Sequence, residues 1–376
     1  MESRINKSYF ENLDALRFFA FLSVFLAHCS SFFAYKFDNK YLELLHKHVF
    51  RNGNLGVGFF FVLSGFLITW LLFTEKDQNG RIHIGHFYMR RVLRIWPVYF
   101  IVVTVGFVIG THDFELLNAL QFNYSINIEQ LKFYIFFLAN YDLVLNGISS
   151  LLLSVLWSVA VEEQFYIVWP LIFLLAKKEF FPFICYLLII ISFVSRYTLQ
   201  TYYSTPEVMS DLAIGGLIAY YALYCPVFLD FFKTISKSKT AFVYLLFFMI
   251  APLRGFSFVF GEKIYAIYYC FESILFSCIF GFIILEQNFS NQSFFKLGRI
   301  KVFGYLGKIS FGLYAYHMLF FPVTFYFIGK SGMAENDFKS YLFKIIFSLL
   351  LTVAFSYLSF NFLEKKILYF KKYFKS

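Results

Sequence analysis

The segment from Leu13 to Phe33, LDALRFFAFLSVFLAHCSSFF, decides how this chain has to be interpreted. At about 1.5 Å per helical residue it is long enough to cross a hydrocarbon core about 30 Å thick. It nevertheless carries Asp14, Arg17 and His28, and it lacks a small-x-small cleavage site. We therefore interpret it as a retained membrane helix rather than as a secretory signal peptide.

The composition of the whole chain is typical of a membrane protein. Its 376 residues are 60% hydrophobic and 15% charged, whereas soluble domains are about 45–50% apolar and about 25% charged. The net charge of +10 is then explained by cytoplasmic loops and anionic lipid headgroups, and no segment resembles a nucleic-acid-binding stretch. The five cysteines lie in apolar runs without paired spacing, so they predict neither a disulfide framework nor structural zinc.

Further apolar stretches along the chain predict an all-α, polytopic membrane protein with about ten transmembrane helices, forming a single domain over residues 1–376. The expected helices are 13–35, 54–74, 94–111, 151–176, 180–200, 208–227, 241–257, 264–285, 308–329 and 341–363. The stretch 131–144 is interrupted by Asn140, Tyr141 and Asp142, which favours a partial or re-entrant helix because a full crossing would place Asp142 in lipid.

The basic residues predict the orientation of these helices. With the N-terminus inside, about two thirds of the 33 Lys and Arg residues fall on inner segments. An even number of crossings then places both termini in the cytoplasm, with a basic cytoplasmic tail from about residue 364. The segment 36–52, expected outside, is also basic.

Ionisable side chains inside apolar spans are functional candidates, because each costs a few kcal/mol to bury in lipid. Arg17 and His28 are eleven positions apart, so they share one helix face, and His28 is expected near mid-depth. The structural alternatives are an interfacial Asp14–Arg17 pair and an interhelical hydrogen bond of His28. His317, in KISFGLYAYHMLFFP, is expected at a similar depth, and packing is its alternative role.

A cluster of arginines lies in HFYMRRVLRIWP, residues 86–97, which we expect to form an inner loop. Arg91 and Arg94 are three positions apart, and Arg90 is adjacent. Guanidinium groups bind phosphate oxygens in a bidentate manner, so the cluster is a candidate clamp for a phosphorylated donor. An ordinary positive-inside anchor remains the alternative.

Two consecutive carboxylates, Glu162 and Glu163, lie within LWSVAVEEQFYIVWP. Consecutive helical positions point about 100° apart, so one carboxylate can face a cavity while the other packs against protein, and the sequence does not decide which. Ser158 and Tyr166 lie four positions before and after Glu162 and extend a polar stripe. A structural hydrogen-bonding role is the alternative.

Small residues in GNLGVGFFFVLSGFLIT predict close helix packing at Gly56, Gly58, Ser64 and Gly65. A phosphate-binding loop is excluded here, because the segment lacks a Lys-Ser/Thr pair and no strand precedes it. Asp211 and Glu272 also fall in or beside expected spans, and the sequence suggests no role for them.

Six segments resemble, in this order, the membrane-bound acyltransferase family 3, whose best-known members O-acetylate bacterial surface glycans. They are LDALRFFAFLSVFLAH, GVGFFFVLSGFLIT, FYMRRVLRIWP, LWSVAVEEQFYIVWP, DLAIGGLIA and LGKISFGLYAYH. The matching motifs are Arg-x10-His on Arg17 and His28, Arg-x-x-Arg on Arg91 and Arg94, Trp-Ser-x-x-x-Glu on Trp157, Ser158 and Glu162, and Tyr-x-x-His on Tyr314 and His317. The chain departs from the family at position 58, Gly instead of Asp, and at position 15, Ala instead of Gly.

The resemblance implies a transmembrane O-acyltransferase, most simply an O-acetyltransferase, in the bacterial inner membrane. The implied donor is cytoplasmic acetyl-CoA or another acyl-CoA, with no metal. The implied acceptor is a hydroxyl of a surface or periplasmic glycan such as lipopolysaccharide, or of a lipid-linked glycan. Membrane lipids are further implied partners, and nucleic acid is not a partner. The oligomeric state stays open, and a homodimer is one of the alternatives. The alternative is a transporter or flippase of a lipid-linked glycan or small molecule without acyl transfer.

The resemblance also distributes roles. The catalytic candidates are His28, Glu162 and His317, the donor-binding candidates are Arg17, Arg90, Arg91 and Arg94, and the acceptor-binding candidates are Trp157, Ser158, Glu163 and Tyr314. His28 is expected to act as a general base or to carry the acyl group as an acyl-histidine, and the sequence does not choose between them. Glu162 could orient an imidazole or bind acceptor hydroxyls, and His317 could polarise an oxyanion or shuttle the proton.

Overall fold

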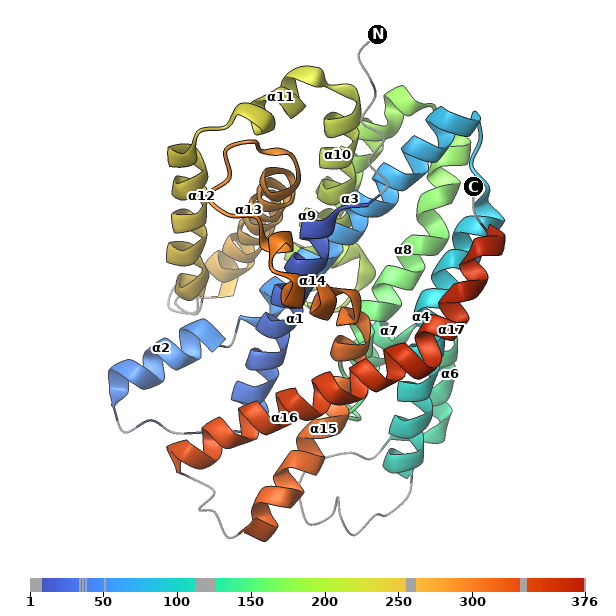
Figure 1. Ribbon diagram of the computed structural model, residues 1–376. Coiled ribbons are helices and arrows are strands. Elements are labelled where there is room, and N and C mark those ends of the chain that lie inside the picture. Colours follow the sequence, from blue (N-terminus) through green and yellow to red (C-terminus); the bar gives the residue numbers. More distant parts are fainter. Residues whose placement is uncertain are drawn as a thin grey trace. The chain divides into compact units, whose positions relative to one another are not determined.

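The computed structural model, drawn in Figure 1, describes residues 9–33, 35, 37, 39–50, 52–111, 126–254, 262–331 and 337–374. It divides into two compact units. The described residues form helices and no strand, which confirms the all-α prediction. Eight of their helices are long and apolar enough to cross a membrane. The bent pair of α10 (Thr205–Tyr224) and α11 (Pro226–Thr234) makes nine if it is counted as one span.

The first unit contains the described residues up to Val24 together with His48–Ile82 and Trp169–Lys308. The unit boundaries fall within α1 (Glu11–Phe32) and α8 (Leu156–Leu175). The other helices here are α3 (Gly53–Asn79), η2 (Lys178–Phe180), α9 (Phe181–Thr198), α10, α11, α12 (Lys237–Ile250), α13 (Glu262–Phe289), η4 (Leu297–Arg299) and α14 (Lys301–Lys308).

Helices α3 and α10 cross at glycines. A Cβ atom placed on Gly65 would lie 2.0 Å from the carbonyl oxygen of Leu212, and one on Gly215 would lie 2.0 Å from that of Val62. Only glycine lets the two backbones approach this closely, so the packing role predicted for Gly65 is confirmed. Gly58 differs, because a Cβ there would have its nearest neighbour, in Phe280, at 3.6 Å.

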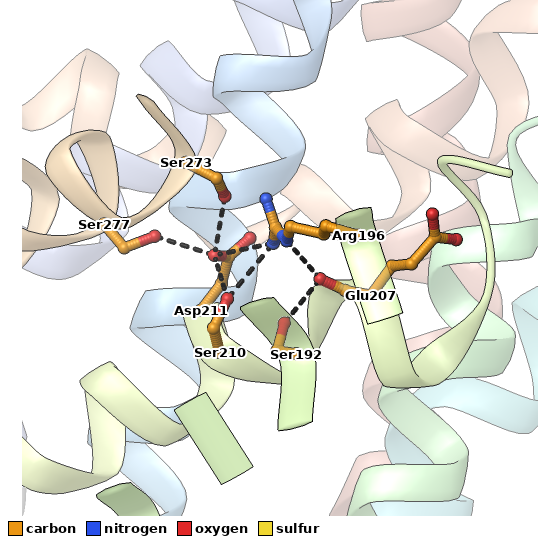
Figure 2. Close-up of polar contacts among 7 residues, drawn as sticks. All are labelled: Ser192, Arg196, Glu207, Ser210, Asp211, Ser273 and Ser277. Carbon is orange, nitrogen blue, oxygen red and sulfur yellow. Dashed lines mark hydrogen bonds and ion pairs between the residues drawn. The ribbon is translucent and has the colours of Figure 1, made fainter. Parts of the chain in front are cut away.

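A buried ion pair joins three helices of this unit, as Figure 2 shows. Arg196 on α9 contacts Asp211 on α10, with 3.3 Å between Nη2 and Oδ1. The same Oδ1 accepts a hydrogen bond of 2.8 Å from Ser277 on α13. The Nε of Arg196 donates to the backbone carbonyl of Glu207, which also accepts from Ser192 at 2.6 Å. Asp211 therefore has a structural role, and its partner Arg196 was not recognised from the sequence.

Glu272, the other acidic residue without a predicted role, is paired in a similar way. Its Oε1 lies 2.6 Å from the Nε of Arg254, and the carboxylate is buried on α13. The guanidinium of Arg254 also lies over the ring of Phe276, 5.5 Å from its centroid. A buried charge persists when it is paired in this way, so Glu272 also belongs to the internal packing of the unit.

The α10–α11 bend and α12 account for the difference between the predicted ten spans and the observed count. The expected span 208–227 breaks at Cys225, because the residue before Pro226 is disfavoured in the helical conformation, and the two helices meet at 96°. The expected span 241–257 corresponds to α12, which has 14 residues and ends at Ile250. Residues 251–254 continue as a 3-10 turn, and 255–257 lie outside the described residues.

The second unit contains the described residues of Phe25–Lys47, His83–Val168 and those from Ile309 onward. Besides parts of α1 and α8, its helices are α2 (Lys40–Phe50, which ends in the first unit), α4 (Ile84–Thr111), η1 (Ile128–Gln130), α6 (Leu131–Ile135), α7 (Ala139–Asn146), α15 (Ser310–Ser331), α16 (Phe338–Ser359), the π-helix η5 (Phe360–Glu364), α17 (Lys365–Leu368) and η6 (Tyr369–Phe374).

The expected partial helix at 131–144 is two short helices, α6 and α7, separated at residues 136–138. The polar residues expected to interrupt it, Asn140, Tyr141 and Asp142, lie within α7 instead. Asp142 is buried and accepts hydrogen bonds from Gln130 at 2.8 Å and from Tyr134 at 3.3 Å. Burial and the Asp142 carboxylate raise the pKa of Tyr134 above its ordinary value, so the phenol stays protonated and donates. Asp142 thus fixes the junction between the two short helices.

The arginine segment 86–97 is not a loop, contrary to the sequence prediction. It forms part of α4, which begins at Ile84 and continues through Pro97. Arg, Leu and Met favour helix, and a proline within a membrane helix is tolerated when neighbouring groups compensate for its missing N–H. Arg91 and Arg94 therefore lie on one face of a helix, which makes their three-residue spacing geometrically meaningful.

The basic segment expected as a tail from about residue 364 is helical as far as the structure describes it. It continues α16 through η5 and α17 to η6, and both α17 and η6 pack against α4. Figure 1 shows this continuation at the red end of the chain.

Candidate active site

Two histidines from helices far apart in the sequence meet in the second unit. The Nδ1 of His28 on α1 lies 2.9 Å from the Nε2 of His317 on α15, and the two rings stack at 18° with 5.1 Å between centroids. His317 is fully buried, with the rings of Phe25 and Phe321 beside it, whereas His28 keeps some accessible surface. The structure therefore brings together the two histidines that the sequence placed at similar depth.

The hydrogen bond made by the second ring nitrogen of His317 determines which nitrogens of the two histidines carry protons. Its Nδ1 lies 2.7 Å from the carbonyl oxygen of Tyr314, which can only accept a hydrogen bond. In a neutral imidazole the other nitrogen then carries a lone pair, so the Nε2 of His317 accepts from an N–H at the Nδ1 of His28. The remaining nitrogen, Nε2 of His28, is left with a free lone pair. That is the form a general base or a nucleophile requires.

Ser158 and Tyr314 form a second contact between α8 and α15. Their hydroxyl oxygens are 2.7 Å apart, and each lies 3.2 Å from the carbonyl oxygen of Val155. Both side chains are buried. This triangle fixes the turn of α15 that presents the Tyr314 carbonyl to His317.

The two consecutive glutamates have different surroundings. Glu163 is 5% exposed, and its Oε2 accepts a hydrogen bond of 3.0 Å from the indole of Trp96 on α4. Its Oε1 is buried and finds no hydrogen-bond partner among the described residues. Glu162 is partly exposed and accepts a hydrogen bond of 3.0 Å from Tyr166. Glu162 is therefore the carboxylate with surface available to a substrate.

The arginines on α4 are held by neighbours in the same unit. The guanidinium of Arg91 lies over the rings of Phe87 and Tyr166, 5.6 and 5.5 Å from their centroids. Arg90 donates a 2.7 Å hydrogen bond from Nη1 to the carbonyl of Phe374. Arg94 interacts electrostatically with Glu364. Stacking on aromatic faces orients a guanidinium while leaving its edge able to bind an anion.

The last two predicted site residues are Arg17 on α1 and Trp157 on α8. Arg17 belongs to the first unit, where its Nη1 lies 2.5 Å from the Oδ1 of Asp14, and Tyr9 donates to the other oxygen of that carboxylate at 2.5 Å. The local pair considered as an alternative for Arg17 is thus present. Trp157 lies on α8 beside Ser158 and is partly exposed.

The sequence missed several residues that support the site. Trp96 and Phe87 hold Glu163 and Arg91, and their only sequence signal was their position within the arginine segment. Lys371 interacts electrostatically with Arg94, Arg91 and Arg90, and lies in the segment that the sequence predicts to be a basic tail. Among the described residues, no cluster of three or more His, Cys, Asp or Glu side chains is arranged to hold a metal ion.

Comparison with known proteins identifies the family. A family described as "acyltransferase domain" matches residues 10–360, so this chain belongs to that acyltransferase family, as the sequence motifs predicted. The chain is similar to O-acetyltransferase OatA of Staphylococcus aureus strain NCTC 8325 / PS 47, with 27% identity over an alignment of 383 positions that covers 98% of this chain. The protein of the same name from strain COL gives the same identity and coverage.

This chain spans 58% of the length of each of these two relatives. No solved structure matches it significantly. The fold and the family are thus established for a multi-pass helical membrane protein.

Proposed function

We propose that this protein is a membrane O-acyltransferase of the bacterial inner membrane that moves an acyl group, most simply acetyl, from cytoplasmic acyl-CoA to a hydroxyl of a surface or periplasmic glycan such as lipopolysaccharide. The observation that carries the proposal is the hydrogen-bonded pair of His28 and His317, with its proton arrangement set by the Tyr314 carbonyl. Family membership and the name O-acetyltransferase of its relatives support the same reaction class.

The free lone pair of His28 serves either of two routes. In the direct route, Nε2 takes the proton of the acceptor hydroxyl as its oxygen attacks the thioester carbonyl carbon, the C–S bond breaks, and the same proton passes to the leaving thiolate. In the two-step route, Nε2 attacks the thioester carbonyl carbon, the C–S bond breaks, and CoA leaves as the thiolate. The acceptor hydroxyl then attacks the acyl-histidine, the bond from the acyl carbon to Nε2 breaks, and the proton of the hydroxyl balances the thiolate to give the CoA thiol. Both routes place positive charge on His28, which the hydrogen bond to His317 stabilises.

His317 is proposed to act as a positioning residue. Its Nδ1 and Nε2 are both engaged, with the Tyr314 carbonyl and with His28. It therefore has no free N–H in the neutral form to polarise an oxyanion, and orienting His28 is the role that fits its contacts. Second partners of this kind commonly fix the tautomer and the ring orientation of a reactive histidine.

The remaining predicted roles follow the surroundings of each residue. Arg91, Arg94 and Arg90 would hold the phosphates of the donor, and the stacking of Arg91 supports this because its guanidinium is already oriented. Glu162, with its accessible surface, would bind acceptor hydroxyls. The buried residues Glu163, Ser158 and Tyr314 would support the site rather than contact the acceptor, and no contact assigns Arg17 or Trp157 to either substrate.

The proposal is tested by following release of the CoA thiol from acetyl-CoA by the purified protein with a candidate glycan acceptor. His28→Gln, which can retain a hydrogen bond to His317 but cannot act as a base, should lower kcat by at least about 10²-fold. His83→Ala removes a histidine outside the pair and should leave kcat unchanged.

Acceptor-dependent thiol release together with an acetyl mass added to the acceptor would support acyl transfer. Glycan movement across vesicles without thiol release would instead identify a transporter, and an unimpaired His28→Gln variant would remove the histidine from the mechanism.

A further inference from the structure

The segment Lys365–Phe374 supplies a cation to the arginine face of α4. Four lysines lie along it: Lys365, Lys366 and Lys372 are exposed, whereas Lys371 is partly buried. The segment is held against α4 by packing and by the hydrogen bond from Arg90 to the Phe374 carbonyl. The position of Lys371 is therefore defined by the fold of the second unit.

Lys371 lies among like charges. It interacts electrostatically most strongly with Arg94, then with Arg91 and Arg90. Among the described residues, the side chains of Lys371 and Arg94 make no hydrogen bond or ion pair, and Arg94 interacts electrostatically with the carboxylate of Glu364. Cations gathered in a partly dehydrated site repel one another, so their convergence is stabilised by an anion that carries several negative charges.

We propose that Lys371 is a further donor-binding residue, and that it completes, with Arg90, Arg91 and Arg94, a site for the phosphate groups of acyl-CoA. This inference rests on the proposed function, because it names a binding residue for the same donor. Lys371 lies beyond residues 10–360, where the chain matches the acyltransferase family, so the match itself does not predict it.

Phosphate oxygens are the shared chemistry of two ligands that can reach such a site, the pyrophosphate and ribose phosphate of CoA and the headgroup of an anionic phospholipid. The four basic groups lie on two segments that converge, α4 and η6. Such a cluster fits a compact polyphosphate, which presents several phosphates together, better than a single lipid phosphodiester.

The test is a titration of the purified full chain in neutral detergent with CoA and, separately, with pantetheine, which lacks the phosphates. Lys371→Ala should weaken CoA binding about tenfold or more, the loss expected for one charge-assisted contact, and leave pantetheine binding unchanged. It should also reduce the dependence of CoA affinity on salt concentration. Lys371→Arg should retain the affinity, and Lys372→Ala, which alters an exposed lysine of the same segment, should bind CoA like the unaltered protein.

The outcomes separate this inference from the proposed function. If the unaltered protein binds CoA, and Arg91→Ala weakens that binding while Lys371→Ala does not, Lys371 is not part of the site and the function stands. If the unaltered protein binds no CoA, the proposed function itself falls. If Lys371→Ala changes only the binding of phosphatidylglycerol added to the micelles, the site is one for lipid and the inference is overturned. An unchanged melting temperature of Lys371→Ala excludes a folding defect as the cause.

Discussion

A backbone carbonyl that touches no substrate governs the candidate catalytic group. The carbonyl of Tyr314 fixes the proton on His317, and His317 in turn fixes the proton on His28. This chain of hydrogen bonds depends on α15 being held in register, which the contact between Ser158 and Tyr314 provides. The proton arrangement of His28 therefore depends on the backbone of another helix.

The activity of His317 variants should depend on whether the new side chain places a hydrogen-bond acceptor at the position of Nε2. In His317→Gln the amide oxygen can accept the N–H of His28, so kcat should remain within about tenfold of that of the unaltered protein. His317→Leu removes the acceptor and should lower kcat at least about 10²-fold with little change in the KM for acyl-CoA. Equal losses in the two variants would mean that His317 only fills space, and steady-state kinetics with acetyl-CoA distinguish the two results.

At this scale the sequence named the candidate residues but not their pairing. Helical spacing placed His28 and His317 at similar depths, yet nothing local specifies which side chains of two helices meet. The sequence also leaves open which of Glu162 and Glu163 is buried, because the burial of Glu163 involves Trp96, a residue of another helix, α4. Arg196 was overlooked although a lone arginine within an apolar span is itself a signal.

At the scale of helices, backbone contact decides which elements pack together. Helices α3 and α10 touch through Gly65 and Gly215, with no room for a side chain at either position. The motif of small residues predicts such a contact, but it does not distinguish among its four small residues. The structure separates them, because Gly58 has ordinary van der Waals space around it.

A methyl group at Gly65 should therefore separate α3 from α10. We expect Gly65→Ala to lower the free energy of unfolding by about 1–3 kcal/mol, the range typical of overpacking. Gly58→Ala is the matched control on the same helix and should be near neutral. Thermal unfolding of the two detergent-solubilised variants provides the measurement, and equal melting temperatures would show that the crossing can relax.

The existence of the helices was easier to predict than their ends. Apolar length alone identified most spans, since lipid leaves the backbone few alternatives to a helix. Hydropathy predicts a loop at the polar start of α4, because it ignores the helical preference of Arg, Leu and Met. Conversely, Pro226 bends the chain within an apolar run in which hydropathy registers no interruption.

For the whole molecule, the side of the membrane on which the segments after α12 lie depends on whether α12 crosses the membrane. Its 14 residues extend about 21 Å, and the 3-10 turn at residues 251–254 adds about 2 Å per residue, so together they approach the thickness of the core. The chain after α13 lies beside the chain before α12, since the backbone amide of Asn291 donates a 3.1 Å hydrogen bond to the carbonyl of Lys233. The loops on either side of the α12–α13 hairpin thus share one face.

We expect both loops to face the cytoplasm, as the positive-inside rule requires of the predicted ten-span topology. Single cysteines at Lys237 and Gln292, in a background without the five native cysteines, should resist a membrane-impermeant maleimide in intact cells and react after lysis. A cysteine at Gln200, in the loop expected outside, should react in intact cells. Labelling of Gln292→Cys but not Lys237→Cys before lysis would mean that α12 does not cross, and the termini would then lie on opposite sides.

The ion pair between Arg196 and Asp211 also bears on how the chain enters the bilayer during synthesis. Both charges belong to consecutive helices, α9 and α10, and the second contact of Arg196, the Glu207 carbonyl, is on α10 as well. The two helices can therefore leave the insertion machinery as a hairpin that already neutralises its own charges, before α13 has been translated. Ser277 of α13 then adds a hydrogen bond to a pair that is already formed, so the order of synthesis and the order of stabilisation coincide.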